Sequence, residues 1–367
     1  MKFLNMKFNK ILLGTITLFI SSIVFAGNED RAGSAGASEL LINPWAASNG
    51  MANANTADVD GLEAVYLNVA GLAFSDKIEI GFAHTNFLAG SNTNINLGAF
   101  ASKISESDVI AISIMSMSFG DINITTTDQP EGGLGVISPK YSNFALSYAH
   151  IFSPSISGGL TVKMINQNIF NAKASGFAFD AGLRYMTGGE NNDKLKFGIT
   201  LRNVGSPMRY SGDGYSVLSS FGDRNDDETF TTQTRSASFE LPTLLSIGLS
   251  YDFDLNEMSK IVTAFNFNAN SFTRDDYSLG VRYNVKVKRA EFNAKIGYTF
   301  VKSVFDEIGP RATALTGLSA GFSLDYMIGK DASASSDDKT SFGFDYAYQT
   351  SNPFNGVHSI GVRLGIN

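Results

Sequence analysis

The chain has 367 residues and no cysteine, and this absence excludes several protein classes at once. It can hold no disulfide framework, no zinc–thiolate site, no thiol nucleophile and no lipid-anchored cysteine. Its 28 Lys+Arg stand against 35 Asp+Glu, for a formal net charge of −7, which argues against a nucleic-acid-binding protein. After residue 26 it also lacks any run of about 18 apolar residues, the length that a membrane-spanning helix needs.

The first segment is predicted to be a signal peptide covering residues 1–26. Lys2, Lys7 and Lys10 precede an apolar stretch at 11–25, and small residues lead up to a cleavage point after Ala26. A membrane anchor is the alternative, but the apolar run is short for a span and a polar stretch follows it. An exported chain without cysteine suggests the envelope of a Gram-negative bacterium.

Residues 77–367 are dominated by strict alternation of apolar and polar residues. In the segment 318–328, every second residue is apolar, which indicates a strand with one face in an apolar medium. About fourteen such segments occur, most of them roughly 10–14 residues long, which suits a tilted membrane-crossing strand better than an ordinary globular strand. They start near residues 77, 93, 109, 141, 155, 175, 194, 239, 259, 276, 289, 315, 340 and 357. We therefore predict an all-β fold, a transmembrane antiparallel β-barrel of about 14 strands.

The connections between these strands support the same prediction. Long connections at 120–140, 204–238 and 301–314 follow odd-numbered strands, whereas those after even-numbered strands, such as 153–154 and 254–258, are mostly short. Outer-membrane barrels have short periplasmic turns, longer outside loops and both chain termini in the periplasm. A soluble β-sandwich has no reason to sort its loops in this way. The pattern predicts a location in the outer membrane, in contact with lipid.

Glycines recur at positions that the alternation assigns to the inner face. Glycine weakens a strand interior, so a repeated one needs a cause. Sharp coiling of the closed sheet and close approach of something inside the lumen are both consistent with it. The glycines are Gly81, Gly98, Gly159, Gly182, Gly198, Gly248, Gly280, Gly297, Gly321, Gly343 and Gly361.

Charged residues are also predicted on the inner face. They either form ion pairs and hydrogen bonds with one another in a polar lumen or line a substrate path. Asp345 and Arg363 lie on neighbouring strands and are placed to pair. The candidates are Asp180, Arg184, Arg202, Arg282, Asp345 and Arg363.

Residues 27–76 precede the first strand and do not alternate. The part from 27 to 37 is small and polar, and the part from 38 to 74 is rich in Ala and Gly, which favours short helices and tight turns. We predict a plug inside the lumen, for which the inward glycines would leave room. A periplasmic tail is the alternative.

Short motifs in this segment carry a family resemblance. Residues 32–41, 50–54 and 61–72 resemble the mature N-terminus of the PorV/PorQ family of outer-membrane proteins. The family pattern ends in a hydrophobic-Tyr-x-Asn-Pro-Ala-Gly-Leu run, where this chain has Val69 in place of the proline. The motif residues are Gly50, Ala52, Ala54, Tyr66, Asn68, Ala70, Gly71 and Leu72.

The resemblance implies a fourteen-stranded barrel of the FadL-like superfamily and two different functions. PorV-like members bind the C-terminal signal domain of secreted cargo in type IX secretion, and PorQ-like members serve in the attachment machinery. FadL-like members admit long-chain fatty acids or other hydrophobic molecules past an N-terminal hatch. The N-terminal motif favours the first function, with secreted cargo proteins and a secretion translocon as partners. Passive uptake of hydrophobic small molecules and a purely structural barrel are the alternatives.

Two further features bear on this choice. Apolar residues in otherwise polar outside loops indicate either a ligand or partner surface or packing between loops. In the third strand, the apolar parity of Ile110, Ile112 and Ile114 changes at Met115 and Met117, which predicts a bulge or a slipped face. The loop residues are Leu134, Val136, Ile137, Val304, Phe305 and Ile308.

Nothing in the sequence indicates an enzyme, a metal site or a cofactor. The three histidines, His84, His150 and His358, share the outward parity of separate strands and cannot gather around a metal ion. The acidic run 223–228 lacks the spacing and central glycine of a calcium-binding hand, so we expect a solvated loop there. No G-x-S-x-G, H-E-x-x-H or P-loop pattern occurs.

Overall fold

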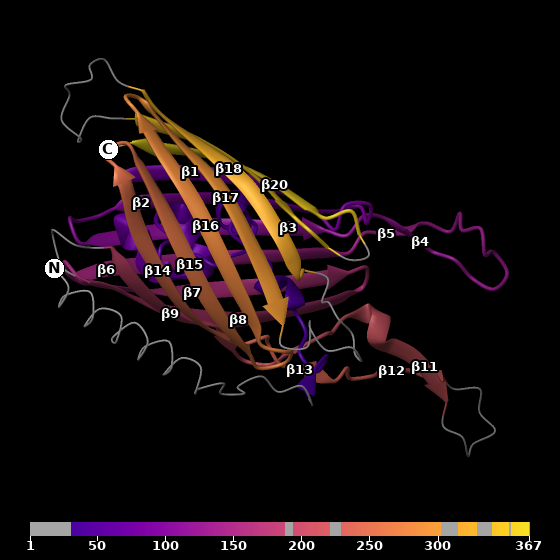
Figure 1. Ribbon diagram of the computed structural model, residues 1–367. Helices are drawn as coiled ribbons and strands as arrows, with labels where there is room; N and C mark the ends of the chain where they lie inside the picture. Colours follow the sequence, from indigo (N-terminus) through magenta and orange to yellow (C-terminus); the bar gives the residue numbers. More distant parts are fainter. Residues whose placement is uncertain are drawn as a thin grey trace.

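Fourteen antiparallel strands close into a barrel in the computed structural model, which confirms the predicted fold class (Figure 1). The structure describes residues 31–187, 194–220, 229–301, 315–328, 340–351 and 354–366. The first and last strands pair along Ile78↔Ile366 and so complete the wall. In order around the barrel, the strands are β1 (Ile78–Phe87), β2 (Thr93–Lys103), β3 (Asp108–Ser118), β6 (Lys140–Ser153), β7 (Ile156–Ile169), β8 (Ala172–Met186), β9 (Leu195–Gly205), β14 (Leu244–Asn256), β15 (Ser259–Asn270), β16 (Asp276–Val287), β17 (Ala290–Val301), β18 (Gly317–Ile328), β19 (Thr340–Gln349) and β20 (Val357–Ile366).

The barrel has two distinct ends. At the turn end, β1 begins, β20 ends, and connections such as 154–155, 257–258 and 288–289 are tight. At the opposite loop end, the chain between β3 and β6 and between β9 and β14 forms short hairpins that extend beyond the wall (Figure 1). These hairpins pair β4 (Ile122–Asn123) with β5 (Val136–Ile137), β10 (Met208–Arg209) with β13 (Ser238–Phe239), and β11 (Ser216–Ser220) with β12 (Thr229–Gln233), with the 3₁₀ turn η6 (Asp213–Tyr215) between β10 and β11.

The outward face of the wall is apolar and exposed. Leu160 is 61% exposed and Ile114 is 55% exposed, although both lie in the middle of long strands. The inward positions between them carry small, polar or charged side chains, as period-2 alternation requires. Among the described residues, no helix has the length and apolar character needed to cross a membrane.

The predicted irregularity in β3 is wrong. β3 pairs without a register shift with β2 and β6, and Met115 and Met117 simply face inward, where they are 1% and 3% exposed. The predicted inward position of Gly98 is also wrong, because it pairs with the outward Phe82 and is itself exposed. An irregularity within the wall lies instead between β8 and β9, where Arg202 and Asn203 together face Asp180.

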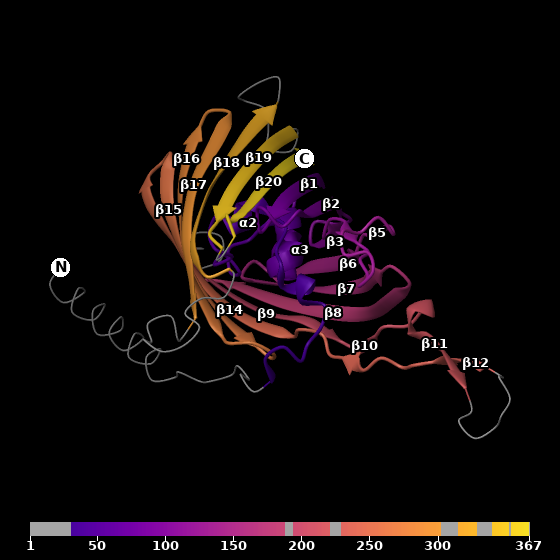
Figure 2. The same cartoon turned by 90° about the vertical axis from the view of Figure 1, so that its right-hand side faces the viewer.

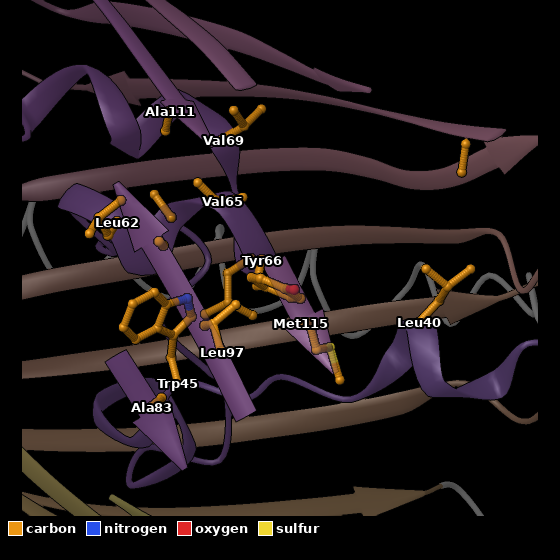
Figure 3. Packing of buried hydrophobic residues seen from close by; sticks show 14 of the residues in the cluster. Leu40, Trp45, Leu62, Val65, Tyr66, Val69, Ala83, Leu97, Ala111 and Met115 are labelled. Carbon is orange, nitrogen blue, oxygen red and sulfur yellow. The ribbon is translucent and has the colours of Figure 1, made fainter. Parts of the chain in front are cut away.

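Short helices at the N-terminal side lie inside the ring of strands (Figure 2). Their apolar side chains, including Trp45, Leu62 and Tyr66, pack against inward residues of β1 to β3 such as Leu97 and Met115 (Figure 3). We call residues 38–75 the plug. It contains η2 (Ser38–Leu41), α2 (Ala46–Asn49), η3 (Gly61–Glu63), α3 (Ala64–Leu67) and η4 (Val69–Phe74).

The plug runs through the barrel from one end to the other. Residues 31–37 lie at the loop end, where Ala35 forms a parallel bridge with Glu240 and Arg31 pairs with Glu240 at 2.7 Å. This segment therefore begins at the loop end and not at the turn end, where outer-membrane barrels usually have their chain termini. Asp58 and Asp60 reach the turn end, where the chain then continues into β1.

Candidate functional site

A ring of inward glycines surrounds the plug. A Cβ atom built on Gly280 would lie 2.9 Å from the Met51 carbonyl oxygen, and one on Gly198 would lie 2.6 Å from the Thr56 carbonyl oxygen. Any side chain at these positions would collide with the plug backbone. Close approach of the plug therefore accounts for eight of the eleven glycines. These eight are Gly81, Gly159, Gly182, Gly198, Gly248, Gly280, Gly297 and Gly321.

Asn68 joins the plug to the wall at one point of this ring. Its Nδ2 donates to the carbonyl oxygens of Thr56 (3.0 Å) and of Leu183 in β8 (3.1 Å). Its Oδ1 accepts from the backbone N–H of Ala70 (3.2 Å) and thereby caps η4. The side chain is 1% exposed, and both its amide nitrogen and its amide oxygen have hydrogen-bond partners in this buried position.

The turn-end half of the plug is held by ion pairs with the wall. Asp58 accepts from Lys196 and from Arg282, whose Nη2 lies 2.5 Å from Asp58 Oδ2, and Asp60 pairs with Arg184. Burial of Asp58 alone would raise its pKa, but Arg282, Lys196 and Arg184 together lower the pKa below its ordinary value. The carboxylate is thus ionised and fully partnered.

A second cluster of charges surrounds Arg363 in β20. Its Nε lies 3.0 Å from Asp345 Oδ2 and 3.7 Å from Glu63 Oε1, and its Nη2 lies 3.1 Å from Asp325 Oδ1. The pairing of Asp345 with Arg363 on neighbouring strands is present as the sequence indicated. Glu63 of the plug also accepts from Ser48 Oγ at 3.0 Å, while burial raises its pKa.

The bulge in β9 is built around a buried ion pair. Lys163 Nζ lies 2.5 Å from Asp180 Oδ2, with both side chains at most 3% exposed, and it also donates to Asn203 Oδ1. Asn203 adopts a left-handed conformation (φ 61°), and its backbone N–H donates to Asp180 Oδ1 at 2.8 Å. Two residues of β9 oppose one residue of β8, which is the definition of a β-bulge. The bulge places Asn203 on the inward face directly after the inward Arg202 and returns Val204 to the outward face.

A cavity of about 260 Å³ lies between the plug and the wall at the loop end. Its apolar lining includes Ile42, Leu67, Phe87, Leu244 and Val301. Polar groups are contributed by Asn43, Asn268, Asn270, Asp276, Gln349 and Arg202. We call this space the loop-end cavity.

Arg202 differs from the other inward cations of the wall described above. Its Nη1 donates to the Tyr66 carbonyl oxygen at 2.5 Å, whereas its buried Nε has no acceptor. Among the described residues, no carboxylate lies within ion-pair distance of its guanidinium, although the side chain is only 8% exposed. A buried guanidinium without an ion-pair partner is costly unless a ligand or water completes its bonding.

The space between the plug and the wall at the turn end has a more charged lining than the loop-end cavity. Two cavities of about 320 and 360 Å³ at the turn end are lined mainly by charged side chains, including Lys260, Lys286, Glu291, Lys194 and Asp254. The lumen therefore changes from a mixed apolar and amide surface at the loop end to a charged surface at the turn end. Such an arrangement holds an amphipathic molecule at the loop end more readily than at the turn end.

The structure brings the residues of the N-terminal motif together inside the lumen. Gly50 lies against Gly321, Ala52 has a positive φ of 54°, and Gly71 leaves room for the Val59 carbonyl oxygen. The remaining members, Ala54, Tyr66, Asn68, Ala70 and Leu72, are at most 5% exposed. The lumen charges all face inward as well. Asp180, Arg184, Arg202, Arg282, Asp345 and Arg363 occupy the clusters described above.

The candidate outer-loop surface is not assembled among the described residues. Leu134 and Val136 are 48% and 52% exposed near the β4–β5 hairpin, Ile137 is half-buried there, and none of the three lines the loop-end cavity. Val304, Phe305 and Ile308 lie outside the described residues, as do the signal-peptide segment and the acidic run 223–228. Sequence reasoning missed Asp58 and Glu63 as plug anchors, because neither lies in an alternating segment that would assign it a direction.

Comparison with known proteins finds likeness in structure alone. No protein-family model matches the chain, and no curated protein matches it. Among solved structures, the CymD monoaromatic hydrocarbon channel superposes with a TM-score of 0.53 at 11% identity, covering 88% of this chain and 97% of that one. The toluene transporter TodX of Pseudomonas putida gives 0.52 at 10% identity, with 88% and 97% covered. A FadL homologue of Pseudomonas aeruginosa gives 0.50 at 12% identity, with 87% and 96% covered. At such identities the likeness establishes a shared FadL-like barrel fold.

Proposed function

We propose that this protein is an outer-membrane channel that admits small hydrophobic or amphipathic molecules, with the loop end outside the cell and the turn end in the periplasm. The loop-end cavity carries this proposal, because it is a partly apolar space between the plug and the wall that a molecule entering from outside would reach first. The similar solved structures, two of which are described as a hydrocarbon channel and a toluene transporter, favour the same function.

The size of the cavity restricts the class of molecule. An apolar cavity of about 150 Å³ in another protein is enough for benzene. The loop-end cavity of about 260 Å³ is therefore large enough for one substituted aromatic ring or a short alkyl chain. The amides at its rim and the guanidinium of Arg202 suit a ligand with one polar end, such as a phenol or an aromatic carboxylate.

The type IX secretion function, with secreted cargo and a translocon as partners, is the less supported alternative. It rested on the short N-terminal motif, whose residues have a structural use here because they pack the plug into the barrel. The exposed apolar residues on the described loop-end hairpins lie on two separate hairpins. Ile122, Leu134 and Val136 belong to the β4–β5 hairpin, and Val217 and Leu218 to the β11–β12 hairpin.

Uptake by whole cells of a Gram-negative host without channels of this type would test the proposal. Radiolabelled toluene and benzoate are the two probes, and cells carrying the wild-type protein should take up at least one of them faster than cells with an empty vector. Leu244→Trp fills the loop-end cavity and should abolish the gain. Leu245→Trp is the matched control, because the neighbouring residue faces outward and is 37% exposed. Equal uptake with and without the protein, or equal effects of the two variants, would contradict the proposed channel.

A further inference from the structure

A further hollow lies on the outer surface of the wall, facing away from the lumen. It has a volume of about 460 Å³ and is formed by β6, β7, β8 and β9. We call it the outer groove. Its main lining residues are Tyr148, His150, Gly158, Leu160, Ala181 and Leu183.

Small residues form the floor of the outer groove. Gly158 occupies an outward position opposite Leu183, yet it is buried because the neighbouring side chains rise around it. A Cβ atom at Gly158 would lie 2.9 Å from both Leu183 Cδ2 and Phe152 Cε2. Ala181 continues the floor on the next strand, opposite Leu160. Any side chain at Gly158 would therefore crowd Leu183 and Phe152, and a long one would fill this part of the groove.

A polar cluster stands at one side of the groove. Asp108 accepts three hydrogen bonds, from Ser105 Oγ, from the Tyr148 hydroxyl (2.5 Å) and from His150 Nδ1 (2.8 Å). With Nδ1 held by the carboxylate, Nε2 is the imidazole nitrogen left for another partner, and among the described residues none bonds to it. The ring of His150 also packs edge-on against Phe152, with centroids 4.8 Å apart, which fixes its orientation.

The position of this cluster matches the edge of a membrane. Asp108 is the first residue of β3, and His150 lies three residues before the end of β6, so both are close to the turn end. Ionised side chains on the outward face of a barrel are tolerated near the interface and are costly at the bilayer centre. The groove thus has a polar side at headgroup depth and an apolar body next to it, on strands that face lipid.

We infer that the outer groove binds one glycerophospholipid of the periplasmic leaflet, with an acyl chain on the floor at Gly158 and Ala181. Its phosphodiester accepts a hydrogen bond from Nε2–H of His150 in the imidazolium form, because Nδ1–H already donates to Asp108. The inference rests on the proposed outer-membrane placement but concerns a site separate from the transport path. The backbones of the paired Gly159 and Gly182 separate the groove from the lumen, and Val69 of the plug lies behind Gly159. The occupant therefore comes from the bilayer and not from the loop-end cavity.

Native mass spectrometry of the purified protein in detergent, titrated with dioleoyl phosphatidylglycerol, tests the inference. The wild-type protein should retain one lipid under conditions that strip the others. His150→Ala should weaken retention about tenfold, the loss expected for a hydrogen bond between a charged donor and a phosphate. Gly158→Leu should prevent retention. Gly98→Leu is the matched control, since Gly98 also faces outward but has no atom within 4 Å of its Cβ position.

Each outcome decides the matter once heat-modifiable gel migration has shown that every variant is a folded barrel. Retention by Gly158→Leu equal to that of wild type, an equal loss in Gly98→Leu, or no lipid retained by wild type would overturn the inference. Capture of the transport probes instead of the phospholipid would also overturn it. Normal uptake of toluene or benzoate by Gly158→Leu, together with lost lipid retention, would support the groove as a site independent of transport. If the wild-type protein retains the lipid but takes up neither probe, the result would contradict the proposed channel function and leave the lipid site supported.

Discussion

Alanine substitutions at two glycines of the barrel should differ in their effect on plug docking, because only one of the two glycines touches the plug. A Cβ atom at Gly297 would lie 2.6 Å from both the Ala52 nitrogen and the Met51 carbonyl oxygen. At Gly98 it would meet nothing within 4 Å. Alanine is favoured over glycine in a strand interior by about 0.5–1 kcal/mol, so both variants gain in strand stability. In Gly297→Ala the added methyl group also overpacks against the plug backbone. This overpacking should destabilise the docked position of the plug by about 1–3 kcal/mol.

A cost of this size changes the population of undocked plug about 5- to 150-fold. Trp45 is the only tryptophan in the chain, is 1% exposed, and lies in the same segment of the plug as Met51. Its accessibility to acrylamide quenching therefore measures docking directly. Gly297→Ala should raise the quenching constant and shift the emission to longer wavelength, while Gly98→Ala should match wild type. Identical quenching in the two variants, with both folded by heat-modifiable migration, would refute the glycine-ring explanation.

Three further substitutions test the anchors of the plug and the cavity. Asn68→Ala removes the amide that joins Thr56 to Leu183 and caps η4, with the loss of three buried hydrogen bonds, so plug docking should weaken by about 2–4 kcal/mol, measured by the same quenching. Asp58→Asn leaves Lys196 and Arg282 without their carboxylate and should cost about 3–5 kcal/mol. Because the folded pKa of Asp58 is lowered from 3.8, its contribution is fully present above that value and is lost only as the pH falls further. The difference in quenching between wild type and Asp58→Asn should therefore stay constant from neutral pH down to about pH 4. Arg202→Met should reduce uptake of benzoate more than uptake of toluene, and equal effects on the two probes would show that the guanidinium does not recognise the polar end.

The strands could be predicted because long alternating segments have few alternative structures. The observed starts differ from the predicted ones by at most five residues, the largest difference being 239 against 244 for β14. Alternation over ten or more residues specifies both the strand and its inward face. The prediction was wrong at β3 for a physical reason. Its inner face is apolar at Met115 and Met117 because these residues pack against the plug, so the apolar residues there mark an inner core and not a slipped face.

The β9 bulge is visible in the sequence as a change in the spacing of outward apolar residues. Ile199 and Leu201 are outward apolar residues, and the next one is Val204, three positions on instead of two. That change of parity marks the extra residue in the polar pair Arg202–Asn203. The partners of the plug had no comparable signal. Ala35 meets Glu240 across more than two hundred positions, and no local pattern specifies a contact between two irregular segments.

The path of the plug limits how this barrel can conduct a molecule. The segment is tied at the loop end through Glu240 and continues at the turn end directly into β1, so it cannot leave the lumen as one body without unfolding. Its turn-end half carries the buried ion pairs of Asp58 and Glu63, and each would have to separate in a low-dielectric space. Its loop-end half, which lines the cavity, is held to the wall mainly by apolar packing and by neutral hydrogen bonds such as Asn49 to Ser359 and Thr85 to the Pro44 carbonyl oxygen, which separate at lower cost. A ligand in the loop-end cavity should therefore first displace residues 41–53, and passage to the turn end requires a slower second step that breaks the charged anchors.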